Sequence, residues 1–169
     1  VANGDIYKQT GGTGDFIALG QTARYWRGIT STPSGDVYAA VSFGDIYKQT
    51  GGSGDFIALG QTNRQWAGLA STPSGDIYSC VANGDIYKQT GGTGDFIALG
   101  QTVRLWYSIT STTQGAIIAA AADTGIYALK YYIPPRQNLL INSNFDFWQE
   151  ATSLSSGTGL RRTSDGSFT

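Results

Sequence analysis

An internal repeat constrains this chain more than any other feature. The 19-residue segment GDIYKQTGGTGDFIALGQT begins at positions 4, 44 and 84, so the period is 40 residues, and Ser53 is its single change. A fourth, diverged copy begins where residues 125–127 (GIY) stand in register with residues 5–7 (DIY). Repeats of 20–50 residues indicate stacked units, because one such unit cannot bury its apolar face alone. The chain should therefore fold as an array.

Each repeat is long enough for four short β-strands and their turns. In the first copy we expect strands at residues 5–10, 15–19, 24–30 and 36–42. Glycine makes up 24 of 169 residues, about twice its ordinary share. It recurs at fixed positions, including the hairpin signal GGTG at 11–14. No stretch shows a helical period. The sequence predicts an all-β protein with little helix.

Constant and variable positions alternate along the third strand. Three constant or small positions return in each copy: Arg24, Trp26 and Gly28; Arg64, Trp66 and Gly68; Arg104, Trp106 and Ser108. Successive side chains of a strand point to opposite faces, so we expect one packed face and one free face, with the three tryptophans buried. Ile29, Leu69 and Ile109 fall out of phase, which predicts a β-bulge at the small residue before each.

The predicted hairpin YKQTGGTGDFIALG (residues 7–20) resembles a degraded Asp-box. The Asp-box is the S/T-x-D-x-G-x-T-W hairpin of β-propeller blades such as those of sialidases. Phe16 stands where the motif has Trp, and the Asp that names it is missing. The resemblance implies 40-residue, four-stranded antiparallel propeller-type blades. The strand that carries Trp26 (residues 24–30, the Trp strand) and the strand at residues 36–42, which follows Gly35 (the G-D-V-Y strand), would lie inside. The two hairpin strands would lie outside. Propellers usually have four to eight blades, so we expect a piece of a longer array or closure between chains.

The pattern ends after Lys130. We divide the chain into residues 1–130 (three repeats and a partial fourth), a Pro-containing linker at 131–137, and residues 138–169. The segment NLLINSNFDFWQ at 138–149 resembles the first residues of the C-terminal domain of bacteriophage tail-fibre and receptor-binding proteins. That domain is a β-sandwich similar to a carbohydrate-binding module. The resemblance implies an extracellular virion protein of the phage tail, with only the start of the β-sandwich present.

Composition argues against several functions. Net charge is −1 with scattered Lys and Arg, so we expect no nucleic-acid partner. No run of 18 apolar residues is present, which predicts no membrane insertion. His is absent and no D-x-D-x-D run occurs, so we expect no metal site and no cofactor. Glu150 is the only Glu; we expect no catalytic residues and no enzyme. Cys80, the only cysteine, should be a small buried side chain.

The variable face of the third strands supplies the candidate ligand-binding residues. Aromatic, amide and guanidinium side chains suit polar sugar rings, and five of them lie there: Tyr25, Arg27, Asn63, Gln65 and Tyr107. An ordinary solvated strand face is the alternative for each. We expect attachment to a bacterial surface glycan without catalysis. Two alternatives stay open: a polysaccharide depolymerase (tailspike) whose catalytic part lies outside this chain, and a purely structural tail or baseplate spacer.

The tail fibres that this chain resembles are generally homotrimers. The repeats are too few to close a ring, their terminal strands would be exposed edges, and Tyr131, Tyr132 and Ile133 form an apolar run. We therefore expect a homo-oligomer, a trimer, assembled with other phage tail or baseplate proteins. The segment from Tyr131 onward should not fold independently but pack against a neighbour.

Overall fold

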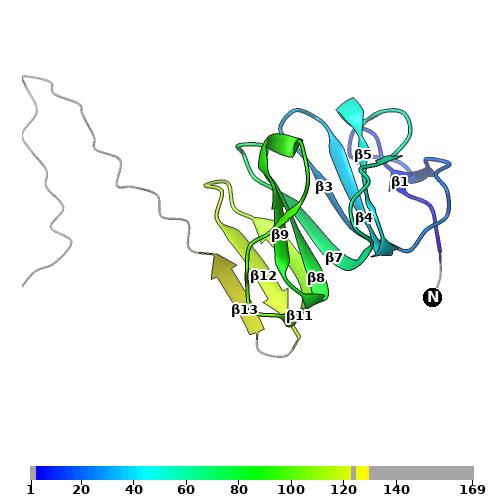
Figure 1. Ribbon diagram of the computed structural model, residues 1–169. Helices are drawn as coiled ribbons and strands as arrows, with labels where there is room; N and C mark the ends of the chain where they lie inside the picture. Colours follow the sequence, from blue (N-terminus) through cyan, green and yellow to red (C-terminus); the bar gives the residue numbers. More distant parts are fainter. Residues whose placement is uncertain (1–2, 123–124, 130–169) are drawn as a thin grey trace, which may run out of the picture. The chain divides into compact units, whose positions relative to one another are not determined.

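The computed structural model describes residues 3–122 and 125–129, with side chains up to residue 122. These residues belong to one compact unit, Val1–Tyr132. In Figure 1 its strands succeed one another from blue through green to yellow. The expected linker at 131–137 and β-sandwich start at 138–169 lie outside the described residues.

The strands form an N-terminal hairpin followed by one 11-stranded antiparallel sheet, which we divide into three blades. The hairpin is β1 (Tyr7–Lys8) and β2 (Ile17–Ala18). The first blade contains β3 (Trp26–Ser31), β4 (Val37–Gly44), β5 (Ile46–Gln49) and β6 (Ile57–Ala58). The second contains β7 (Arg64–Ser71), β8 (Ile77–Gly84), β9 (Ile86–Gln89) and β10 (Ile97–Ala98). The third contains β11 (Arg104–Ser111), β12 (Ile117–Ala121) and β13 (Gly125–Leu129).

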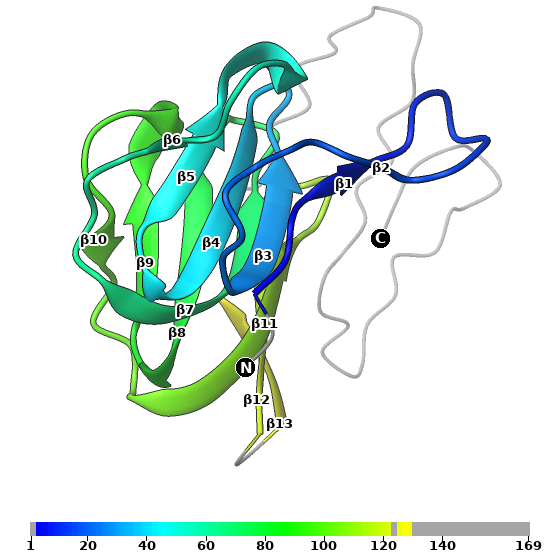
Figure 2. The same ribbon diagram turned by 90° about the vertical axis from the view of Figure 1, so that its right-hand side faces the viewer.

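The order of strands within a blade agrees with the propeller-type expectation. Each blade starts with the Trp strand and continues through the G-D-V-Y strand, and the hairpin of the next repeat completes its outer side; Figure 2 shows β3, β4, β5 and β6 side by side. The all-β, propeller-like fold is confirmed. Strand β13 pairs with β12 as β5 pairs with β4, with Ile126 opposite Ala120 and Ile46 opposite Ala40. The diverged fourth copy is therefore real.

The hairpin strands are shorter than predicted, at two to four residues. The reason lies in the Asp and Gly residues that flank them. Asp45 accepts hydrogen bonds from the N–H groups of Ile46, Gly60 and Gln61 at 2.6–2.8 Å, and Asp5 and Asp85 repeat this arrangement. In the first blade, Asp45 thus fastens the segment that follows the outermost strand β6 to the start of β5. The turns after β5 and β9 contain the only helical segments in the described part, Thr50–Gly52 and Thr90–Gly92.

The expected bulge is present, with the extra residue one position before the small residue. In the second blade Trp66 pairs with Val81 and Gly68 with Cys80, so Ala67 has no partner across the ladder. The same shift occurs in the first and third blades. Because the bulge changes the phase, Trp66 packs towards the first blade, whereas Ala67 and Gly68 both lie against the third. The expectation that the constant positions share one face and the variable positions the other was therefore wrong.

Two apolar clusters join the blades. Trp66, Leu69, Ile77 and Val81 of the second blade pack with Tyr38, Ala40 and Ile46 of the first. On its other face the second blade packs Ala67, Tyr78 and Cys80 against residues of the third, including Trp106 and Ile109. Each large apolar side chain buried in this way contributes about 1.5–3 kcal/mol. The repeats thus stabilise one another through their faces.

The buried side chains agree with the predictions at most positions. Trp66 and Trp106 are 1% and 3% exposed, whereas Trp26 is only half-buried because a hairpin alone precedes its blade. Cys80 is fully buried as expected, and burial raises the pKa of its thiol to about 11.

Inner strands of adjacent blades approach each other closely. A Cβ atom on Gly28 would lie 2.8 Å from the Gly68 Cα, and one on Gly68 would lie 3.2 Å from the Ser108 Cα. Short pairings of β4 with β7 and β8 with β11 also link the blades into one continuous sheet. The small residue of the Trp strand is therefore required by contact between blades.

Candidate functional site

The five predicted binding residues lie on the inner strands or in the segments that lead into them. Tyr25 precedes β3 and Arg27 is its bulge residue; Asn63 precedes β7 and Gln65 is its second residue. Tyr107 is the bulge residue of β11. Arg27, Asn63 and Tyr107 are exposed, and Tyr25 and Gln65 are half-buried. At the bulge position of the second blade Ala67 is buried, so this position is not uniformly free.

Three of the five are brought together at the junction of the first and second blades. The Ser42 N–H donates to the Tyr25 carbonyl at 3.0 Å, and Ser42 is also the cross-strand partner of Gln65. Arg27 donates to the Tyr25 hydroxyl at 3.0 Å, with its guanidinium carbon 5.2 Å from the ring centroid. Among the described residues, no hydrogen bond, ion pair or ring contact joins Asn63 or Tyr107 to this group.

Phe43 lies at the same junction and is not among the five residues that the sequence predicts. It stands in the register shift between Ser42 and Gly44, has φ of +59°, and is 72% exposed. A bulky side chain in the left-handed region costs free energy that Asn largely avoids. The equivalent Asn83 has φ of +56°. The signal was in the sequence, because Asn precedes the GD pair at positions 3 and 83 and Phe only at 43.

We call Tyr25, Arg27, Phe43 and Gln65 the junction cluster. It offers two aromatic rings, a guanidinium with several donors, and an amide that both donates and accepts. Ring faces pack against the C–H faces of sugars, and fixed polar groups select hydroxyl positions. Phe43 is exposed and adopts a backbone conformation that is costly for Phe, so it does not stabilise the fold. This points to a role in binding.

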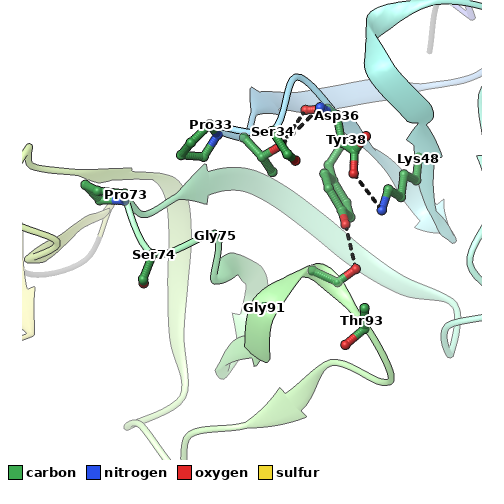
Figure 3. Close-up of a pocket in the computed structure, with 12 residues that line it drawn as sticks. Pro33, Ser34, Asp36, Tyr38, Lys48, Pro73, Ser74, Gly75, Gly91 and Thr93 are labelled. Atoms are coloured by element: carbon green, nitrogen blue, oxygen red, sulfur yellow. Dashed lines mark hydrogen bonds and ion pairs between the residues drawn. The ribbon is translucent and has the colours of Figure 1, made fainter.

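A groove of about 410 Å³ opens between the first and second blades at the opposite ends of these strands. Figure 3 shows Asp36, Tyr38 and Lys48 on one side, with Gly91 and Thr93 across from them. The turns of both blades contribute hydroxyl groups and prolines to its lining: Thr32, Pro33, Ser34, Pro73 and Ser74.

The polar groups of this groove already satisfy one another. Lys48 Nζ lies 2.8 Å from Asp36 Oδ2, and the Gly51 N–H donates to Asp36 Oδ1 at 2.9 Å. The hydrogen bond from Lys48, followed by that from Gly51, lowers the pKa of Asp36, and the same ion pair raises the pKa of Lys48. Tyr38 donates its hydroxyl proton to the Gly92 carbonyl at 2.9 Å. At neutral pH these groups act as fixed binding or structural groups, since both stay charged.

The repeated arginines have a structural role. Arg24 lies over the Tyr47 ring and Arg64 over the Tyr87 ring, each 4.7 Å from the centroid. These tyrosines in turn contact Trp26 and Trp66 edge-on. Each guanidinium therefore supports the aromatic packing of its own blade.

Residues 3–122 and 125–129 contain no group of three His, Cys, Asp or Glu side chains placed to hold a metal ion. Within that same part of the chain, no helix has the length and apolar character needed to cross a bilayer.

No protein-family model matches the chain, and no curated protein sequence is significantly similar to it. Among solved structures, it is similar to a catalytically inactive virginiamycin B lyase from Staphylococcus aureus with quinupristin. The identity is 17%, the match covers 74% of this chain and 47% of that one, and the TM-score is 0.50. A streptogramin B lyase (22% identity, 68% and 43% coverage, TM-score 0.47) and YCF48 bound to D1 peptide (18%, 71% and 41%, TM-score 0.46) also match.

The chain thus spans about half the length, or less, of the solved structures that it matches. At these identities the likeness concerns the fold alone. The comparison with the virginiamycin B lyase supports a propeller-like all-β architecture for the chain.

Proposed function

We propose that this chain is part of a phage tail-fibre or receptor-binding protein that attaches to a bacterial surface glycan without catalysis. The junction cluster is the observation that carries the binding role, above all the exposed Phe43 in a left-handed conformation. The resemblance of NLLINSNFDFWQ to the sequences of tail-fibre proteins supports the assignment to a virion. The Asp-box-like hairpin supports blades of the kind that sugar-active propellers use.

The chemistry of the cluster fits a sugar better than a charged polymer or a peptide strand. Phe43 and Tyr25 present ring surface, while Arg27 and Gln65 hold donors and acceptors beside it. Arg27 is held in place by its contacts with the Tyr25 ring and hydroxyl. Such preorganised polar groups lower the ordering cost of binding.

The test is Phe43→Asn, which installs the residue found at position 83. Binding to an array of purified bacterial capsular and O-chain polysaccharides should weaken at least about fivefold, as expected for the loss of one aromatic contact of about 1 kcal/mol. Thermal stability should stay equal or rise, because Asn tolerates the left-handed backbone. Val103→Asn, which removes another exposed apolar side chain, is the control and should bind as the parent does.

The outcomes separate the alternatives. If the parent binds no polysaccharide on the array, attachment to glycan is wrong; if Phe43→Asn binds as well as the parent, the junction cluster is not the site. New reducing ends after incubation of the full-length protein with a bound polysaccharide would identify a depolymerase. A spacer would be indicated if deleting one 40-residue repeat shortened the fibre and left adsorption to cells intact.

A further inference from the structure

The outer hairpin segment of the repeat, with many exposed residues, is constant, whereas the inner strands, which supply most of the core, vary. The 19-residue hairpin segment differs only at Ser53 among its three copies. In the inner strands even core positions change, with Ala39 and Ala40 replaced by Ser79 and Cys80, all at most 1% exposed. Both halves of a repeat are copied together, so recent duplication does not account for this contrast. Exposed side chains usually vary freely because packing does not constrain them.

Hydrogen bonds and backbone conformation explain why some residues of this segment are the same in all three copies. In the second copy Asp45 fastens the loop, Gln49 donates to the Gly54 carbonyl, and the Gln61 side chain accepts from the Phe96 N–H of the next blade. The glycines at 51, 52, 54 and 60 have positive φ. In the second copy these duties do not involve the side chains of four further residues, all exposed: Thr50, Ser53, Asp55 and Ile57. In the third copy the equivalent of Asp55, Asp95, accepts a hydrogen bond from Gln61 Nε2 at 3.4 Å.

Those four residues line one pocket together with Lys48 and Leu59. Its volume is about 400 Å³, and we call it the rim pocket because it lies against the outermost strand β6. The first copy forms the same pocket, about 390 Å³, from Lys8, Thr10, Thr13, Asp15, Ile17 and Leu19. The third copy has the same six positions at 88, 90, 93, 95, 97 and 99. The single change in the segment, Ser53 for Thr, lies in this pocket and keeps the hydroxyl group.

An apolar side chain is left in water at the same place in all three copies. Ile17, Ile57 and Ile97 are 66%, 65% and 64% exposed. Lone exposed apolar residues are common, but three at one repeat position, each beside two hydroxyl groups and a carboxylate, form a recurring amphipathic surface.

We propose that the rim pockets bind successive units of one neutral, repeating polysaccharide, one unit per 40-residue repeat. Ile57 and Leu59 supply an apolar floor for the C–H face of a sugar ring. Thr50 and Ser53 donate and accept hydrogen bonds, and the Asp55 carboxylate accepts from ring hydroxyls. This inference rests on the proposed attachment to glycan and adds a set of sites separate from the junction cluster.

The charges of the pocket select a neutral polymer. In the second and third copies the lysine is ion-paired, Lys48 with Asp36 and Lys88 with Asp76, each at 2.8 Å, so its charge is already compensated. In the first copy Lys8 donates to the Gly52 carbonyl at 3.1 Å. The Asp55 carboxylate then dominates the pocket, and a uronic-acid polymer would bring a like charge against it. Identical pockets repeated along one chain also suit a polymer, because linked sites raise affinity without new contacts.

The decisive variant replaces all three rim carboxylates: Asp15→Asn, Asp55→Asn and Asp95→Asn. Its affinity for neutral polysaccharides of the array should fall at least about tenfold, since charge-assisted hydrogen bonds are lost. The matched control, Thr22→Ala, Thr62→Ala and Thr102→Ala, changes exposed residues of the same segment outside the pocket and should bind normally. Oligosaccharides of one, two and three repeat units should bind with rising affinity.

Each outcome decides the proposal. Unchanged binding by the triple Asp variant, together with loss in Phe43→Asn, overturns the rim sites and leaves attachment through the junction cluster. Preference for acidic over neutral polymers also overturns it, and a parent that binds no polysaccharide overturns both proposals. If the Asp variant unfolds, the triple variant Ile17→Ser, Ile57→Ser and Ile97→Ser tests the same pockets, and normal binding by that folded variant refutes them.

Discussion

Single side chains carry much of the stability between blades. Trp66 is 1% exposed, meets Tyr87 edge-on at 5.2 Å, and packs in one cluster with Tyr38 of the preceding blade. We expect Trp66→Ala to lower the free energy of unfolding by about 3–5 kcal/mol through loss of burial and formation of a cavity. Trp26→Ala, at a half-buried position, should cost clearly less. Urea denaturation measures both, and equal losses would contradict this account.

Gly28 shows that one missing atom can be essential. A Cβ there would lie 2.8 Å from the Gly68 Cα, in backbone that cannot move aside. Gly28→Ala should therefore destabilise the fold by about 1–3 kcal/mol, the usual cost of overpacking. Gly4→Ala is the control, since nothing lies within 4 Å of its Cβ position. Equal melting temperatures for the two variants would show that the inner strands separate at little cost.

At the scale of elements, the Asp carboxylates join the two ends of each outer hairpin. Asp45→Ala removes the acceptor of three backbone N–H groups, and we expect a loss of at least about 2 kcal/mol because hydrogen bonds to charged groups are among the stronger ones. Asp55→Ala, at an exposed position of the same hairpin, should change stability little. Amide exchange at Gly60 and Gln61 should rise only in Asp45→Ala; unchanged protection would reject the fastening role.

Two ion pairs, Asp36 with Lys48 of β5 and Asp76 with Lys88 of β9, predict that the protein is less stable in acid. Burial alone disfavours the charged form of Asp76, but the Lys88 and Gly91 hydrogen bonds outweigh it and lower the pKa of Asp76 below its ordinary 3.8. A lowered folded-state pKa stabilises the protein at pH values above the ordinary pKa, and this contribution is lost as the pH falls through the folded-state value. Melting temperatures should thus fall below about pH 4. The double variant Asp36→Asn and Asp76→Asn should show a flatter profile, and an unchanged profile would contradict the assignment.

At the scale of the whole molecule, the first blade has an open face. Ile29 is 56% exposed, whereas the equivalent Leu69 and Ile109, each covered by a preceding blade, are 6% and 7% exposed. We expect the intact protein to form a homo-oligomer, a trimer, as its resemblance to tail fibres implies. Light scattering at micromolar concentration tests this, and a monomeric mass would refute it. A trimer should also adsorb to host cells far more firmly than a monomerised variant, because avidity multiplies weak sites.

The sequence by itself determined the period, the all-β class, the order of strands in a blade, the burial of Trp66 and Trp106 and the existence of a bulge. These features follow from local rules, since turn glycines and alternation by two act within a few residues. The requirement for Gly28, the burial of Ala67 and the grouping of Tyr25 with Gln65 depend on contacts between residues about 40 positions apart. The sequence shows that Phe43 replaces the Asn of positions 3 and 83. Only the structure shows that Phe43 has a positive φ and an exposed side chain, and so a conformational cost. The rim pockets are likewise a product of folding, because a hairpin must close before Lys48 and Ile57 can share one surface.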